Sequence, residues 1–182
     1  MENSLINRAF VDFALFDWLG LEEVLRRPRH QAHDRESVIS LVDLAERIAR
    51  ESFLSHYKKS DRDEPRLTDD GVEILPEIGP ALERYAEAGF LAAPFAEEVG
   101  GFALPELVHV ACMAHFMAAN VATAAYPMLT TGNARLLAAF GTPAQVDAFV
   151  RPQLAGTAFG TMCLSEPQAG SSLAEITTRA AP

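Results

Sequence analysis

The sequence has few cysteines, only two among its 182 residues. That number is too small for the disulfide framework that stabilises small secreted domains. Cys112 lies in an apolar stretch with helical periodicity, and Cys163 lies in an apolar stretch with strand periodicity. We therefore expect both side chains to be buried free thiols of a protein that works in a reducing compartment.

Excess positive charge and long apolar runs are also absent. The formal net charge of -10 argues against binding to nucleic acid or to anionic membranes, because both need a cationic surface. No stretch is apolar for long enough to span a membrane, and the first residues lack the basic and then apolar pattern of a signal peptide. With 49% hydrophobic and 22% charged residues, the composition is globular, and we expect a cytoplasmic protein without membrane insertion.

Familiar catalytic and metal signatures are missing as well. The sequence contains no Gly-x-Ser-x-Gly elbow, P-loop or zinc-ligand pattern, so it gives no reason to treat Ser165 as a hydrolase nucleophile. His30 and His33 are three positions apart, but they flank a proline-led connector without a third ligand nearby, and a solvated turn is favoured over a metal site. The acidic residues between 61 and 70 lack the glycine and the terminal glutamate of a calcium loop. No metal site is predicted.

Apolar residues recur at helical spacing through most of the chain. The predicted helices cover residues 11–25, 34–53, 76–89, 105–120, 123–140 and 143–150, separated by loops that include 58–71 and 90–102. Asp34 is placed to cap the second helix, and the missing N–H of Pro127 predicts a kink or break in the fifth. Helices that are apolar along one stripe must bury that stripe against each other, so the chain is predicted to be mainly α, beginning with a helical bundle.

The pattern changes beyond Gly156 from the period of a helix to that of a strand. Residues 159–164 mix aromatic, β-branched and apolar side chains on both faces, as in a strand buried on both sides, and residues 174–180 form a second strand candidate. We therefore expect an N-terminal α-helical domain over residues 1–156 and the incomplete start of a β domain over residues 157–182.

A turn of small residues follows the first predicted strand. Pro167 ends the strand, Gly170 lets the backbone approach a ligand closely, and Ser171 and Ser172 add hydroxyl donors to their N–H groups. Backbone donors in such a turn can form a nest for phosphate oxygens. From these residues alone, an anion-binding turn and an ordinary solvent loop are equally good interpretations.

The segment Leu164-Ser-Glu-Pro-Gln-Ala-Gly-Ser171 resembles the flavin-binding signature of the acyl-CoA dehydrogenase family. Gly132-Asn133, the turn over 141–145 and the segment over 152–156 are placed as in the N-terminal half of that family, and the resemblance covers almost the whole chain. Within the family, the chain is most similar to the longer members that act on substituted acyl-CoA thioesters.

The resemblance implies a site for FAD. The backbone of Met162 and Leu164 and the hydroxyl of Ser165 are expected to face the flavin ring, where a donor stabilises the negative charge of the reduced ring. Gly170 and Ser171 are expected to hold the pyrophosphate, and Ser171 is also expected to contact the substrate. Ser172 stands where many members have Asp, so a contact made by that carboxylate is in doubt.

The resemblance also implies partners and further domains. The expected substrate is an acyl-CoA thioester, the expected oxidant is an electron-transfer flavoprotein, and the expected assembly is a homo-oligomer. In the family, a complete β-barrel-like domain and a second helical domain with the catalytic glutamate follow, so this chain is predicted to hold only the first strands of a truncated barrel, no catalytic residue and no activity of its own. The alternatives are a non-catalytic helical interaction module and a portion of an acyl-CoA oxidase.

Four residues could line the acyl-chain pocket in a protein of this family. They are Tyr126, Met128, Leu129 and Thr131. A Met-containing apolar lining suits a thioester tail, but ordinary core packing explains the same residues equally well.

Overall fold

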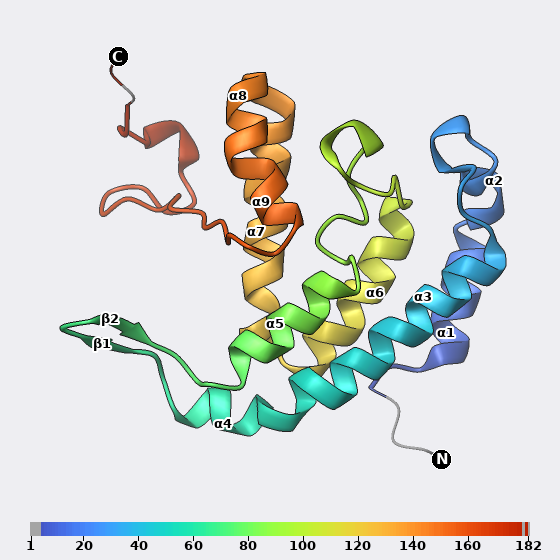
Figure 1. The fold of residues 1–182 in the computed structure, drawn as a ribbon, viewed down its shortest axis with the longest axis horizontal. Helices are drawn as coiled ribbons and strands as arrows, with labels where there is room; N and C mark the ends of the chain where they lie inside the picture. The colour runs from blue at the N-terminus through green and yellow to red at the C-terminus, as the bar shows by residue number, and fades with distance from the viewer. Residues whose placement is uncertain (1–4, 180, 182) are drawn as a thin grey trace.

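The computed structural model describes residues 5–179 and residue 181. Helices make up the body, and a hairpin and an irregular C-terminal segment extend from it (Figure 1). The α-helices are α1 (Arg8–Asp12), α2 (Leu21–Leu25), α3 (Arg35–Ile48), α4 (Tyr57–Arg62), α5 (Ile78–Glu87), α6 (Glu106–Ala119), α7 (Val121–Phe140), α8 (Pro143–Gln145) and α9 (Arg151–Leu154). The strands are β1 (Arg66–Thr68) and β2 (Gly71–Glu73). The predicted mainly helical fold is confirmed.

Several α-helices continue into turns of π or 3-10 geometry. The π turns are Phe13–Trp18, Ala49–Phe53 and Val146–Val150, and the 3-10 turns are Pro28–His30, Leu54–His56, Glu97–Val99 and Leu173–Glu175. As a result, α3 is followed without a loop by two such turns and then by α4. No helix in the described part of the chain is both long and apolar enough to cross a membrane.

The first predicted helix is broken where the sequence contains a glycine. Gly20 lies between Trp18 and α2 with a φ of 61°, in the left-handed region that favours glycine. The helix that follows begins as predicted. Asp34 accepts a hydrogen bond from the Ser37 N–H at 2.8 Å, and Ser37 Oγ accepts one from the Asp34 N–H at 2.9 Å, which forms a capping box.

The core is organised around Phe116 of α6. Its ring centroid lies 4.7 Å from that of Tyr85, 4.9 Å from that of Phe53 and 5.3 Å from that of Phe90. All four rings are buried, and α3, α5, α6 and the loop after α5 each pack side chains into this cluster. Cys112 is buried beside it, as predicted, and burial raises the pKa of its thiol to about 12.

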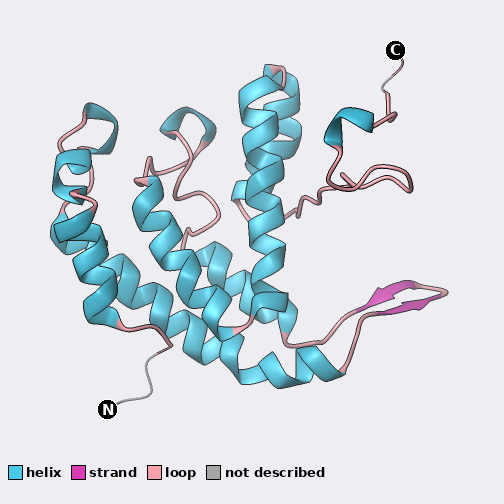
Figure 2. Ribbon diagram, turned by 180° about the vertical axis from the view of Figure 1, so that it is seen from behind, coloured by secondary structure: helices cyan, strands magenta, loops and turns pink. Residues whose placement is uncertain are grey.

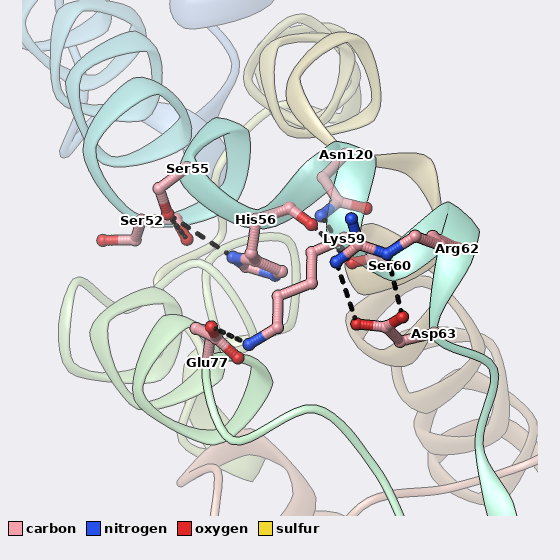
Figure 3. A network of polar contacts seen from close by, with 9 residues as sticks. All are labelled: Ser52, Ser55, His56, Lys59, Ser60, Arg62, Asp63, Glu77 and Asn120. Carbon is pink, nitrogen blue, oxygen red and sulfur yellow. Dashed lines mark hydrogen bonds and ion pairs between the residues drawn. The ribbon is translucent and has the colours of Figure 1, made fainter.

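Hydrogen bonds join the arm from α3 to α4, residues 35–62, to the start of α7, and Figure 3 shows three of the residues that make them, His56, Ser60 and Asn120. Asn120 caps α7 by accepting from the Thr123 N–H, and its side-chain N–H donates to the Phe53 carbonyl and to Ser60 Oγ. His56, also buried, lies within hydrogen-bonding distance of Thr123. α7 then continues through Pro127 without interruption, so the break predicted there is absent, and the proline removes one backbone N–H from the helix.

His30 and His33 bind the loop between α5 and α6. His30 Nδ1 lies 2.6 Å from the Ala103 carbonyl, and His33 Nε2 lies 2.7 Å from the Phe102 carbonyl. Across the described residues, no three His, Cys, Asp or Glu side chains are grouped as metal ligands. The two histidines therefore hold the loop against the 3-10 turn at Pro28–His30.

Two segments extend from the helical body (Figure 2). Antiparallel β1 and β2 pair Leu67 with Val72, so the region predicted as a loop over 58–71 contains all of α4 except its first residue, and strand β1. The second segment, residues 159–179, takes no strand conformation beyond the single bridge Glu166–Ala169. The predicted strand at 159–164 does not form, and neither does the one at 174–180 as far as residue 179, residue 180 lying outside the described residues. A strand needs a hydrogen-bonded neighbour, and no described segment supplies one. Cys163 is consequently exposed, and the prediction that it is buried is wrong.

Candidate functional site

Residues 159–171, which contain the motif that resembles the flavin signature and are called the flavin-signature segment below, are anchored on α7. The Gly160 N–H donates to Thr130 Oγ1 at 3.2 Å, and Asn133 Nδ2 donates to the Thr161 carbonyl at 3.4 Å. A Cβ at Gly160 would lie 2.6 Å from Asn133 Cβ, so the glycine is needed for this close approach. Thr130 and Asn133 are one helical turn apart and thus present their side chains on the same face.

Asn133 is itself held by α9. Gln153, only 6% exposed, donates from Nε2 to Asn133 Oδ1 at 2.9 Å. The sequence had indicated Gly132-Asn133 and the segment around Gln153 as matching positions, but it gave neither side chain a role. The structure connects them to the backbone of Thr161.

The five residues predicted to bind FAD are all exposed. They are Met162, Leu164, Ser165, Gly170 and Ser171. Within the described residues, none of their backbone N–H groups donates to a protein acceptor. Exposed, unpaired N–H groups beside apolar side chains are the donor set that a flavin with its phosphates needs, so the residues present fit this cofactor.

The turn after the predicted strand is organised by Glu166. Its backbone exchanges hydrogen bonds with Ala169, and its carboxylate accepts from the N–H and the hydroxyl of both Thr177 and Thr178. These donors, the Thr178 hydroxyl first, lower the pKa of Glu166 to about 2. Sequence reasoning assigned Glu166 no role, although its place inside the signature was a signal that it has one.

Gly170 and Ser171 follow this turn in open surroundings. A Cβ built on Gly170 has no neighbour within 4 Å, and Ser171 and Ser172 are exposed. Because the turn at Glu166 fixes the chain just before them, Gly170, Ser171 and Ser172 are held in place while they stay exposed to solvent. This arrangement leaves space for a phosphate group beside backbone and hydroxyl donors.

An apolar groove runs between α6 and α7 next to the segment. Its volume is about 370 Å³, and its lining residues are Glu106, His109, Val110, Met113, Ala114, Met117, Met128, Thr131, Gly132 and Arg135. Met162 connects the groove to the flavin-signature segment, because its sulfur lies 3.4 Å from the position that a Cβ on Gly132 would take. Of the four residues predicted to line an acyl-chain pocket, Met128 and Thr131 line the groove, and Tyr126 and Leu129 do not.

Two polar side chains lie in the lining of this groove without a partner. Within the described structure, His109 Nδ1 and Thr131 Oγ1 are buried and make no hydrogen bond. Burial lowers the pKa of His109, which favours the neutral form of its ring. The groove lining is thus mostly apolar, and its charged residues, Arg135 and Glu106, form an ion pair 2.5 Å apart.

Comparison with known proteins identifies the family. Residues 35–157 match the model of the acyl-CoA dehydrogenase N-terminal domain. The chain belongs to the acyl-CoA dehydrogenase family. The match covers α3 to α9 and ends before residue 159, so the flavin-signature segment lies outside it and its role stays a prediction.

A curated member of the acyl-CoA dehydrogenase family is similar over part of the chain. It is the 3-methylmercaptopropionyl-CoA dehydrogenase of Ruegeria pomeroyi, which is 32% identical over 115 residues, or 63% of this chain and 20% of that protein. The chain therefore spans about a fifth of the length of this relative.

Two solved structures share the fold. One is described as the electron transferring flavoprotein of Acidaminococcus fermentans, with a TM-score of 0.64 and 22% identity over 79% of this chain and 35% of that chain. The other is the butyryl-CoA dehydrogenase of Megasphaera elsdenii, with a TM-score of 0.60 and 19% identity over 75% of this chain and 34% of that chain. At these identities the likeness concerns the helical fold, which agrees with the family match.

Proposed function

We propose that the chain forms the N-terminal helical domain, residues 1–156, and the start of the middle β domain, residues 157–182, of an FAD-dependent acyl-CoA dehydrogenase. The observation that carries the proposal is the set of exposed, unpaired N–H groups at Met162, Leu164 and Ser165, in a segment whose Met162 side chain lies next to Gly132 in the lining of the apolar groove. Family membership supports the proposal. We place this enzyme in the cytoplasm.

The residues of the signature segment have distinct roles in this proposal. The backbone of Met162 and Leu164 faces the flavin ring, and the Ser165 hydroxyl donates to it. The N–H groups of Gly170 and Ser171 hold the pyrophosphate, and Ser171 also contacts acyl-CoA. Bound FAD supplies the two-electron acceptor for removal of hydride from the substrate.

The groove between α6 and α7 is proposed to hold the acyl tail. Met128 is 44% exposed, which favours a binding surface over ordinary core packing for this residue. Methionine side chains adapt their shape to irregular apolar ligands, and Met113, Met117 and Met128 all line the groove. The reaction is α,β-desaturation of an acyl-CoA thioester, with its base supplied from outside these residues, an electron-transfer flavoprotein as oxidant and a homo-oligomer as the assembly.

FAD retention by the native polypeptide tests the proposal. That polypeptide is isolated from source cells with an antibody against this segment, and its mass shows whether further domains accompany the chain. We expect a species several times larger that carries FAD and is reoxidised by an artificial acceptor. Rapid reoxidation by oxygen would indicate an acyl-CoA oxidase, and a flavin-free species of this chain's own size would indicate the non-catalytic module. Either result would contradict the proposal.

Substitutions at the signature segment test the site. Gly170→Glu places a carboxylate where the pyrophosphate is expected, in space that is open in the structure, and Ser165→Ala removes one donor. Gly79→Glu is the matched control, because it adds the same charge in open space on α5. We expect both site variants to lose FAD on gel filtration and the control to keep it. Equal FAD content in all three proteins would refute the assignment.

A further inference from the structure

We infer that Asn133 and Gln153 are positioning residues for the flavin-binding backbone: together they fix the peptide at Thr161 and hence the place of Met162 to Ser165. The inference rests on the proposed function for the identity of the ligand. In this inference Asn133 and Gln153 do not touch the cofactor themselves, and they affect its binding only by fixing the position of the segment.

The hydrogen bonds form a chain with one direction. Gln153 Nε2 donates to Asn133 Oδ1, and Asn133 Nδ2 donates to the Thr161 carbonyl. Because the Asn133 oxygen is occupied by a donor from Gln153, the Asn133 amide must point its N–H groups toward the segment. The opposite amide orientation would bring two N–H donors together on one side and two carbonyl oxygens together on the other. Gln153 therefore sets which way Asn133 faces.

The segment has little else to define its position. Within the described residues, the bonds from Asn133 to Thr161 and from Gly160 to Thr130 are the only hydrogen bonds that residues 159–165 make with the rest of the protein. Residues 161–165 are exposed, so packing adds little constraint. A cofactor that binds to this backbone must therefore depend on the two α7 side chains for a prepared site.

Gln153 is buried deeply enough to hold its partner in one orientation. It is 6% exposed, and its Oε1 is buried without a hydrogen bond among the described groups. An unpartnered buried oxygen costs stability, whereas the Nε2 end of the same side chain makes a hydrogen bond of ordinary length, 2.9 Å, to Asn133. The Gln153 side chain thus keeps its hydrogen bond to Asn133 although its own oxygen is left without a hydrogen-bond partner among the described groups.

Asn133→Asp tests the inference with almost no change of shape. The aspartate still accepts from Gln153, but it replaces the donor to the Thr161 carbonyl by a second acceptor, so the segment is repelled from α7. Asn120→Asp is the matched control: it makes the same change on the same helix, where Asn120 donates to Phe53 and Ser60. Asn120 is the N-cap of α7 and Asn133 lies within the helix, so the two sites are 13 positions apart, or roughly 20 Å at the helical rise per residue.

We expect the two variants to change different properties of the protein loaded with FAD. Asn133→Asp should lower the affinity for FAD by about tenfold, which is the usual effect of losing one hydrogen bond. It should also change the visible circular dichroism of the flavin. The thermal midpoint of unfolding should change little. Asn120→Asp should lower the thermal midpoint and leave flavin affinity and spectrum unchanged. Gln153→Leu should reproduce the flavin effects of Asn133→Asp.

Amide hydrogen exchange supplies a measurement that needs no cofactor. Without FAD, the Gly160 amide should exchange faster in Asn133→Asp than in the unmodified protein, and at the unmodified rate in Asn120→Asp. Unchanged exchange together with unchanged flavin affinity would overturn the positioning role while leaving the proposed function intact. If the unmodified protein bound no FAD, the proposed function would fail, and faster exchange in Asn133→Asp would still support control of the segment by Asn133.

Discussion

Thr123 of α7 and His56 of the turn before α4 form a hydrogen bond inside the protein, with Thr123 Oγ1 and His56 Nε2 2.8 Å apart. The two residues are separated by 67 positions in the sequence and are both buried. Burial also lowers the pKa of His56. The bond joins the arm that follows α3 to the helix that carries the flavin-signature segment.

Thr123→Val should destabilise the protein by about 1–3 kcal/mol, because it leaves a buried ring nitrogen of His56 without a partner. Urea unfolding measures the difference. Thr131→Val is the matched control on the same helix, since the buried Thr131 hydroxyl has no partner among the described groups to lose. We expect the control to be neutral or stabilising; equal losses in the two variants would show that the His56 bond contributes nothing.

Replacing His115 with leucine should stabilise the protein, most strongly in mild acid. His115 is fully buried, and within the described structure neither ring nitrogen has a partner. Burial lowers its pKa from the ordinary value of 6.5, so below that pH the unfolded chain takes up a proton that the folded protein does not, and stability falls. His115→Leu removes this loss, although His56 and His109, whose pKa values are also lowered by burial, retain theirs.

Urea unfolding at about pH 7.5 and about pH 5.5 measures this effect, because the two values lie on either side of the histidine titration. The stability gap between the variant and the unmodified protein should widen at the lower pH. Parallel curves with the same gap at both values would mean that His115 does not titrate on unfolding.

Acid should loosen the turn that begins at Glu166. Its pKa is lowered to about 2 from an ordinary value of 4.5, so its contribution to holding Thr177 and Thr178 is complete above pH 4.5 and is lost as the pH falls through about 2. Glu166→Gln should increase hydrogen exchange at both threonine amides at neutral pH. Glu175→Gln, which changes a nearby side chain with no hydrogen bond in the described structure, should not. Protection that persists in Glu166→Gln would contradict the role of the carboxylate.

Phe116→Ala should cost about 3–5 kcal/mol, the usual penalty for removing a buried aromatic ring. Three other rings contact Phe116, so the cavity cannot close without moving several helices. Phe140→Ala removes the same atoms from a side chain that is 84% exposed, and its effect on the urea midpoint should be small. A small effect of Phe116→Ala would mean that the core repacks around the vacancy.

Local signals in the sequence predicted most of the helices. The apolar stripe of α3 and its cap at Asp34 were sufficient, because both act within a few residues. The break at Gly20 was missed because the residues on either side continue the apolar spacing, and a glycine changes the backbone without changing that pattern. Strand β1 was missed because it is short and lies within a run that is rich in charged residues.

The candidate site was predicted less completely than the fold. Composition placed Cys163 and its neighbours in a buried strand, but burial of a strand depends on neighbouring strands that its own sequence does not describe. The signature motif predicted which residues bind the cofactor, and these stay predictions. The roles of Thr130, Asn133 and Gln153 could not be derived, since they depend on α7, α9 and the segment meeting in space.

Thr130 and Asn133 bind main-chain groups of Gly160 and Thr161, not side chains. A different residue at Phe159, Thr161 or Met162 can therefore form the same two bonds, provided that Gly160 is kept. Side chains along this stretch can be exchanged to alter what the protein accommodates there, without shifting the peptide that carries them. On α7, by contrast, the side chains themselves make the two bonds, so sequence variation that keeps the path of this backbone must preserve the donor and acceptor groups at positions 130 and 133.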